Sequence, residues 1–67
     1  MRTPRFYETQ PLSDGQEIDL SDTVTQHVSR ALRMRAGEQI ILFNGDGFEY
    51  RAELTEVAKR SARARIT

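Results

Sequence analysis

The chain has 67 residues, and ten basic side chains balance ten acidic ones, so its formal net charge is zero. This length allows one small domain, predicted over residues 1–67, and excludes the doubly wound sheets and large barrels that carry most small-molecule chemistry. The chain contains no cysteine, which excludes disulfides and thiolate metal sites and favours a cytoplasmic location. No apolar run approaches the roughly 18–20 residues of a membrane-spanning helix, so we expect no membrane partner.

The first twenty residues predict two short strands separated by a loop. Residues 4–8 read Pro-Arg-Phe-Tyr-Glu, and a proline at the start of a strand removes no needed hydrogen-bond donor. Residues 10–15 are rich in turn-forming types. Ile18 and Leu20 then alternate with Glu17 and Asp19, which is the period of a strand with one buried face.

A helix is predicted over residues 22–34. Ser21 and Asp22 are residue types that accept hydrogen bonds from the unpaired N–H groups of a first helical turn. An apolar stripe with helical spacing follows, made of Val24, Val28, Ala31 and Leu32. Gly37 is expected to end the helix, because glycine adopts positive φ at little cost.

The second half of the chain predicts three more strands. Residues 40–43 form a short apolar run, and Asn-Gly-Asp-Gly at 44–47 is a strong hairpin signal. Residues 48–54 alternate until Val57 breaks the phase, which indicates a β-bulge near residues 55–56 before a last strand at 62–66. The fold class is therefore mainly β: a small antiparallel β-barrel of about five strands, with one helix between the second and third strands. The expected core is Phe6, Ile18, Leu20, Val24, Val28, Leu32, Ile40, Leu42, Phe48, Tyr50, Leu54 and Ile66.

Basic and acidic residues alternate in blocks along the chain. Residues 1–7, 27–35 and 59–67 contain only basic charges, whereas 8–26 contains only acidic ones and 36–58 is acidic except for Arg51. Nine of the ten bases are arginine, whose planar fork suits phosphate groups. The basic blocks could converge into one patch, or they could neutralise the acidic blocks across strands.

The basic residues of the predicted helix have two interpretations. His27, Arg30 and Arg33 are spaced by three and drift along one helical face. They could form a phosphate-binding ridge, with His27 as a donor or stacking ring, or an ordinary solvated face at a helix C-terminus. Arg2 and Arg5 could similarly form a nucleic-acid-binding arm or an ordinary terminus.

The basic residues of the last strand have a simpler interpretation. Arg63 and Arg65 project from one face of this strand. We expect them to pair with Glu49, Glu53 or both across the hairpin, since the two strands are adjacent and opposite in charge.

No catalytic or metal-binding constellation is present in the sequence. His27 is the only histidine, and the chain has no HExxH motif, phosphate-binding glycine loop or nucleophile elbow. Asp46 and Glu49 flank a turn, where aspartate is expected for backbone reasons. We therefore predict no catalytic residue, no metal and no cofactor site within this chain.

Three stretches together resemble the N-terminal domain of the RsmE family, the bacterial 16S ribosomal RNA uridine N3-methyltransferases. They are Arg2-Thr3-Pro4-Arg5-Phe6-Tyr7, His27-Val28-Ser29-Arg30-Ala31-Leu32-Arg33-Met34, and Gly37-Glu38 leading into Leu42-Phe43-Asn44-Gly45-Asp46-Gly47. The chain departs from the family where Gln26 replaces a second histidine and Ala31 replaces a valine.

This resemblance implies a PUA-like barrel that helps to bind 16S ribosomal RNA in the small ribosomal subunit. In this family S-adenosylmethionine and the chemistry belong to a knotted SPOUT domain, which also forms the homodimer and is not contained in this chain. The full-length protein is thus expected to be a methyltransferase, while these residues alone are not catalytic. The RNA-facing candidates are Arg2, Arg5, His27, Arg30, Arg33 and Arg35. The alternative is a protein-docking module with no direct RNA contact.

Overall fold

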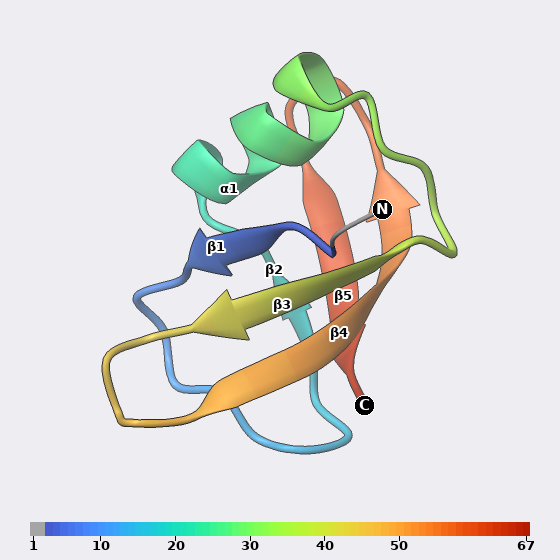
Figure 1. The fold of residues 1–67 in the computed structure, drawn as a ribbon. Helices are drawn as coiled ribbons and strands as arrows, with labels where there is room; N and C mark the ends of the chain where they lie inside the picture. The colour runs from blue at the N-terminus through green and yellow to red at the C-terminus, as the bar shows by residue number, and fades with distance from the viewer. Residues whose placement is uncertain (1–2) are drawn as a thin grey trace.

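The computed structural model describes residues 3–67, which form one five-stranded sheet with a helix across one end (Figure 1). The strands are β1 (Arg5–Tyr7), β2 (Glu17–Asp19), β3 (Gln39–Phe43), β4 (Glu49–Val57) and β5 (Ala62–Ile66). Their order in the sheet is β1-β3-β4-β5-β2. The mainly β class, the five strands and the position of the helix between β2 and β3 are confirmed.

The sheet differs from an antiparallel barrel in two respects. β1 runs parallel to β3, with Phe6 opposite Leu42, while the other three pairs are antiparallel. The sheet is also open, because β1 and β2 form its two borders and do not pair with each other. More than thirty residues separate β1 from β3, which is enough for the crossover that a parallel pair requires.

Side chains close the gap between the two border strands. Glu8, which follows β1, is only 1% exposed, and its carboxylate accepts the backbone N–H of Ser21 at 2.8 Å. The amide of Gln10 donates to the carbonyl of Asp19 in β2 at 2.7 Å. Asn44 in turn donates to the carbonyl of Gln10 at 3.1 Å. These contacts supply polar partners where strand pairing stops, as buried polar groups require.

The helix begins where the sequence predicts but ends three residues earlier. It comprises α1 (Asp22–Gln26) and a π-helical turn, η1 (His27–Ala31), and Ser21 caps its start by accepting the N–H of Val24 at 3.4 Å. The backbone N–H of Leu32 donates to the backbone carbonyl of His27 at 2.9 Å, and the N–H of Met34 donates to the carbonyl of Val28 at 2.7 Å. This last bond closes the helix around Arg33, whose φ is +50°.

Gly37 does not end the helix, contrary to the prediction. It has a φ of +97° in the turn that leads to β3, and its N–H donates to the carbonyl of Leu54 at 2.7 Å. The prediction assumed that the residue with positive φ at the helix end would be a glycine. In the structure that residue is Arg33, which directly follows the apolar stripe, so the helix ends before Gly37.

Most of the predicted core is confirmed, with two clear errors. Leu32 is 49% exposed because the helix ends before it, and Met34 is buried instead. Phe48 is 69% exposed because it precedes the first paired residue of β4. Phe6 and Tyr50 pack on the core while remaining partly exposed. The prediction omitted several buried residues, namely Leu12, Met34, Ala52, Ala62 and Ala64.

The β-bulge predicted near residues 55–56 is confirmed. The register of β4 against β5 shifts between Leu54 and Glu56, so that Leu54 lies opposite Ala64 and Glu56 opposite Arg63. The bulge bends the long strand β4 and brings its end, with the β4–β5 turn, to the side of the sheet that carries the helix (Figure 1).

Candidate nucleic-acid interface

Three surface hollows lie next to one another around the helix. The first, of about 480 Å³, lies between β1 and the helix and is lined by Phe6, Thr23 and His27 among others. The second, of about 350 Å³, shares Thr23 and His27 with the first and extends to Arg30. The third, of about 330 Å³, shares Arg30 with the second and reaches the β4–β5 turn. We call this continuous surface the helix band; its basic residues are Arg5, His27, Arg30, Lys59 and Arg60.

His27 lies in the middle of the helix band with its ring against an aromatic neighbour. Its ring stacks on that of Phe6 in β1, with centroids 5.7 Å apart and planes 30° apart. Phe6 is partly buried and packs on the core, whereas His27 is exposed. The imidazole of His27 therefore lines the first two hollows. The arrangement offers a ring surface and hydrogen-bonding nitrogens to a ligand.

Arg5 lies at the β1 end of the helix band and already has partners within the chain. Its guanidinium forms an ion pair with Glu49 of β4 and lies 5.7 Å from the ring centroid of Phe43. Tyr7, 53% exposed, packs edge-on against the same Phe43 ring at 5.6 Å. An RNA contact through Arg5 would share or replace the pair with Glu49.

The structure separates the other predicted RNA-facing residues into two groups. Arg30 lies on the helix and lines two of the hollows. Arg33 and Arg35 lie past the helix end, are exposed and line none of the three hollows. Arg2 lies outside the described residues. His27 and Arg30 therefore share one surface, and Arg33 does not continue it in the way that a regular helix predicts.

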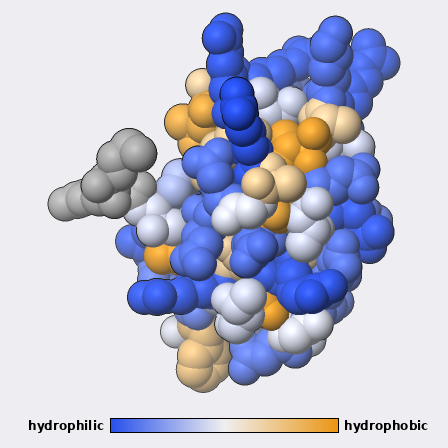
Figure 2. Space-filling view, turned by 90° about the vertical axis from the view of Figure 1, so that its right-hand side faces the viewer, coloured by the Kyte–Doolittle hydropathy of each residue, from blue (hydrophilic) through white to orange (hydrophobic). Residues whose placement is uncertain are grey.

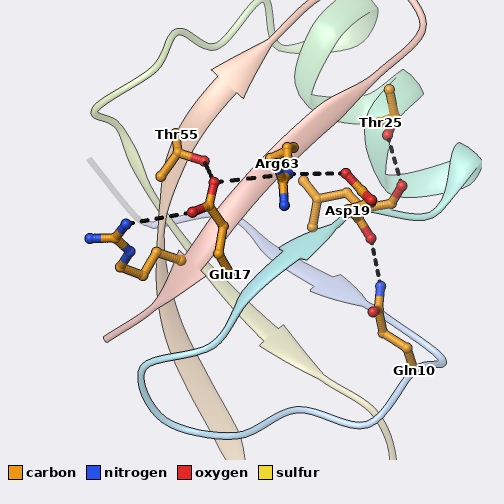
Figure 3. A network of polar contacts seen from close by, with 8 residues as sticks. Gln10, Glu17, Asp19, Thr25, Thr55 and Arg63 are labelled. Carbon is orange, nitrogen blue, oxygen red and sulfur yellow. Dashed lines mark hydrogen bonds and ion pairs between the residues drawn. The ribbon is translucent and has the colours of Figure 1, made fainter.

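The arginines of the last strand are neutralised, but not by the partners that the sequence predicts. The guanidinium of Arg63 lies 3.1 Å from the carboxylate of Asp19 and 3.8 Å from that of Glu17. The guanidinium of Arg65 lies 3.5 Å from the carboxylate of Glu17 (Figure 3). Within residues 3–67 neither forms an ion pair with Glu49 or Glu53. Because β5 lies between β4 and β2, Arg65 is opposite both Glu53 and Glu17, and of these two acids Glu17 comes within ion-pair distance.

Glu17 is the centre of this network on the strands. It accepts a hydrogen bond from the hydroxyl of Thr55 at 3.0 Å, and it faces Arg63 and Arg65 (Figure 3). The hydrogen bond from Thr55, together with the two guanidinium groups, lowers the pKa of the Glu17 carboxyl below its ordinary value. This carboxylate is therefore held in its charged form.

Unpaired bases gather at the helix end of the molecule. Of the bases in residues 3–67, those without an ion pair within 4.0 Å are Arg30, Arg33, Arg35, Arg51, Lys59 and Arg60. All but Arg51 lie on the helix, just after it, or on the β4–β5 turn. Figure 2 shows strongly hydrophilic side chains projecting at the top, where Figure 1 places these segments. Zero net charge thus coexists with a locally basic surface.

Lys59 and Arg60 are the members of this surface that sequence reasoning missed. The sequence shows a basic block at 59–67, but nothing in it distinguishes the first two residues of the block from an ordinary turn before the last strand. Only the fold places that turn beside the helix.

The hairpin turn confirms the backbone role predicted for its aspartate. Asn44 accepts the N–H of Asp46 at 3.1 Å, and Asp46 accepts the N–H of Phe48 at 2.9 Å. The second oxygen of Asp46 accepts a hydrogen bond from the hydroxyl of Tyr50 at 2.7 Å, which raises the pKa of Tyr50.

In the described part of the chain no three histidine, cysteine or acidic residues are grouped so as to hold a metal ion. No helix there is long and apolar enough to cross a membrane.

Comparison with known proteins gives one family match and several similar solved structures. Residues 20–67 match the family described as the RNA methyltransferase PUA domain. A ribosomal RNA small subunit methyltransferase E from Neisseria gonorrhoeae, solved with S-adenosyl methionine, is 43% identical over 97% of this chain, with a TM-score of 0.90. The Legionella pneumophila protein Lpg2936, described as a methyltransferase and solved with the same cofactor, is 42% identical over 100% of this chain, with a TM-score of 0.95.

A more distant similarity extends to Thermotoga maritima. An RNA methyltransferase assigned there by prediction is 28% identical over 96% of this chain, with a TM-score of 0.74. This chain covers 27% of the Neisseria protein and 28% of each of the other two, so it spans about a quarter of the length of these structures.

Proposed function

Because this chain belongs to the family of RNA methyltransferase PUA domains, we propose that it binds ribosomal RNA through the helix band and the arginines that follow the helix. The observation that carries the proposal is the gathering of unpaired bases at this end of the molecule, while the strand arginines are neutralised. Unpaired arginine and lysine side chains bind phosphate without first breaking an internal ion pair.

The proposed substrate is 16S ribosomal RNA of the small subunit, in the cytoplasm, for methylation at uridine N3. The name of the similar Neisseria enzyme supports a small-subunit ribosomal RNA substrate, while uridine N3 and the cytoplasm are what the resemblance to the RsmE family implies. The proposed RNA-facing residues are Arg2, Arg5, His27, Arg30, Arg33 and Arg35. Among them Arg30 and His27 have the strongest support, because they share a hollow and make no ion pair within residues 3–67.

The hollows of this domain are a poor match for S-adenosylmethionine. The cofactor carries a sulfonium cation, whereas each of the three hollows of the helix band is lined by at least one arginine. Like charges placed close together in a hollow repel each other. On the resemblance to the RsmE family, we propose that the cofactor, the methyl transfer and the homodimer contact belong to a SPOUT domain outside these 67 residues.

The test is a binding titration of the chain with a labelled hairpin fragment of 16S ribosomal RNA at several salt concentrations. Each phosphate contact contributes a slope of roughly −0.7 to −0.9 in log K against log salt, which amounts to about five- to eightfold in affinity at 0.1 M relative to 1 M salt. The double change Arg30→Gln with Arg33→Gln should therefore weaken binding by about 25- to 60-fold at that salt concentration.

The matched control removes two positive charges elsewhere. Arg51→Gln with Arg65→Gln lowers the net charge equally but changes the strands, away from the helix band. Equal losses in both double variants would show that only the overall charge matters. No measurable binding of the unchanged chain at low salt would reject the RNA-binding function and favour a protein-docking module.

A further inference from the structure

The β4–β5 turn, residues 58–61, is held against the helix. The N–H of Ala58 donates to the carbonyl of Ser61 at 2.7 Å, which places Lys59 and Arg60 at the tip of a tight connection. The hydroxyl of Ser29 in η1 donates to the carbonyl of Lys59 at 3.5 Å. A cleft of about 330 Å³ lies between the two segments; its lining includes Asp22, Gln26, Arg30, Lys59 and Arg60.

The two walls of this cleft bring together charges that are distant in the sequence. Arg30 and Asp22 lie eight residues apart on the helix, with Gln26 between them, and this spacing of four places them along one face. Lys59 and Arg60 come from the opposite wall. Three bases face one acid, and within residues 3–67 none of these bases forms an ion pair.

We propose that this cleft binds a phosphate group of the RNA backbone, with Lys59 and Arg60 contacting it from the turn and Arg30 from the helix. The inference rests on the proposed function and extends its surface to a second segment of the chain. Arginine binds phosphate through its planar fork, and lysine adds a compact charge that tolerates different approaches. Asp22 opposes the anion and limits the affinity of the cleft.

The extension gives the bound RNA a direction across the helix. The first hollow offers the aromatic pair of Phe6 and His27, which suits an unstacked base. The cleft at the other end offers only polar and charged groups for a backbone phosphate. The RNA therefore crosses the helix from β1 to the β4–β5 turn, in addition to the contacts proposed for the arginines that follow the helix.

The experiment measures binding of the labelled 16S hairpin to the variant Lys59→Gln with Arg60→Gln, against the control Arg51→Gln with Arg65→Gln. Loss of this phosphate contact should weaken binding by about five- to eightfold at 0.1 M salt and make the slope of log K against log salt shallower by about 0.7 to 0.9. The control should stay close to the unchanged chain. Circular dichroism of every variant shows whether the fold is retained.

A change of opposite sign tests the same cleft without removing a base. Asp22→Asn removes the repelling carboxylate and should strengthen binding several-fold at low salt, and this gain should disappear when Lys59 and Arg60 are both glutamine. Ser21 remains the helix cap in this variant.

The outcomes separate this inference from the proposed function. If the hairpin binds and Arg30→Gln with Arg33→Gln weakens it, but Lys59→Gln with Arg60→Gln does not, the RNA-binding function stands and the cleft is not part of it. If the unchanged chain does not bind the hairpin at low salt, both proposals fail together.

Discussion

The carboxylate of Glu8 accepts the backbone N–H of Ser21 at 2.8 Å, and this contact joins the end of β1 to the residue that caps the helix. Glu8 is 1% exposed, so its carboxylate is withdrawn from water, while Ser21 is partly buried. Phe6 lies two residues before Glu8, and His27 lies six residues after Ser21. Because these two rings stack on each other, the contact also fixes one wall of the helix band.

Replacing Glu8 by alanine should destabilise the domain. The change leaves the N–H of Ser21 without its acceptor, and an unsatisfied buried donor costs about 1–3 kcal/mol in the free energy of unfolding. Urea denaturation of the variant measures this cost. Glu53→Ala, at an exposed position of β4, serves as the control and should change stability by less than about 0.5 kcal/mol. Equal losses at the two positions would contradict a structural role for Glu8.

Replacing Arg33 by glycine should preserve or increase stability. Arg33 has a φ of +50°, a conformation that costs a residue with a Cβ about 1–2 kcal/mol and costs glycine little. The greater freedom of glycine in the unfolded chain offsets part of the gain. The control Arg35→Gly has no positive φ to relieve and should lose about 0.5–1 kcal/mol. Thermal unfolding of both variants compares the signs, and a loss at Arg33 as large as at Arg35 would refute the assigned backbone conformation.

The pKa of Tyr50 depends on Asp46. Removing the negative charge in Asp46→Asn should lower the pKa of Tyr50 toward its ordinary value of 10.0, and Asp14→Asn should lower it by less. Ultraviolet titration of the phenol measures both shifts. Since the folded pKa is raised, the stabilising contact is complete below pH 10.0 and is lost as the pH rises through the folded value. An unchanged Tyr50 titration in Asp46→Asn would mean that the contact is absent in solution.

The pKa of Glu17 depends in the same way on Thr55. Thr55→Val removes the hydroxyl donor and should raise the pKa of Glu17 toward its ordinary value of 4.5, as followed by NMR titration of the carboxyl. The folded pKa is lowered, so the network stabilises fully above pH 4.5 and weakens as the pH falls through the folded value. The variant should therefore lose stability less steeply in acid. Thr67→Val removes a hydroxyl that donates to the backbone carbonyl of Arg51 and should leave the Glu17 titration unchanged.

The sequence predicts this fold well where local pattern and tertiary packing agree. The alternation of β4, its bulge and the strand at residues 62–66 follow from period-two burial, which the sheet then enforces. The helix start is equally visible, because Ser21 is a strong capping residue. The helix end is not, since no propensity rule places an arginine at positive φ while a glycine stands four residues later.

Pairing between elements is where the sequence stops being informative. Arg65 lies opposite an acid on each neighbouring strand, Glu53 in β4 and Glu17 in β2, and the sequence does not indicate that its ion pair forms with Glu17. The same holds for Lys59 and Arg60. The sequence indicates only that they lie in a turn, and it is the bend of β4 at its bulge that places this turn beside the helix. His27 and Arg30, by contrast, belong to one short helical segment, so their proximity is local and predictable.

The strand order also constrains when the domain can acquire its native structure. Both borders of the sheet, β1 and β2, come from the first twenty residues, yet their partners β3 and β5 are made later in synthesis. Contacts between residues so far apart in the sequence slow folding, because the chain loses loop-closure entropy before the contact contributes any stabilising free energy. On a translating ribosome β2 cannot dock until the residues of β5 have left the exit tunnel, so the helix band is assembled only after the whole unit has emerged.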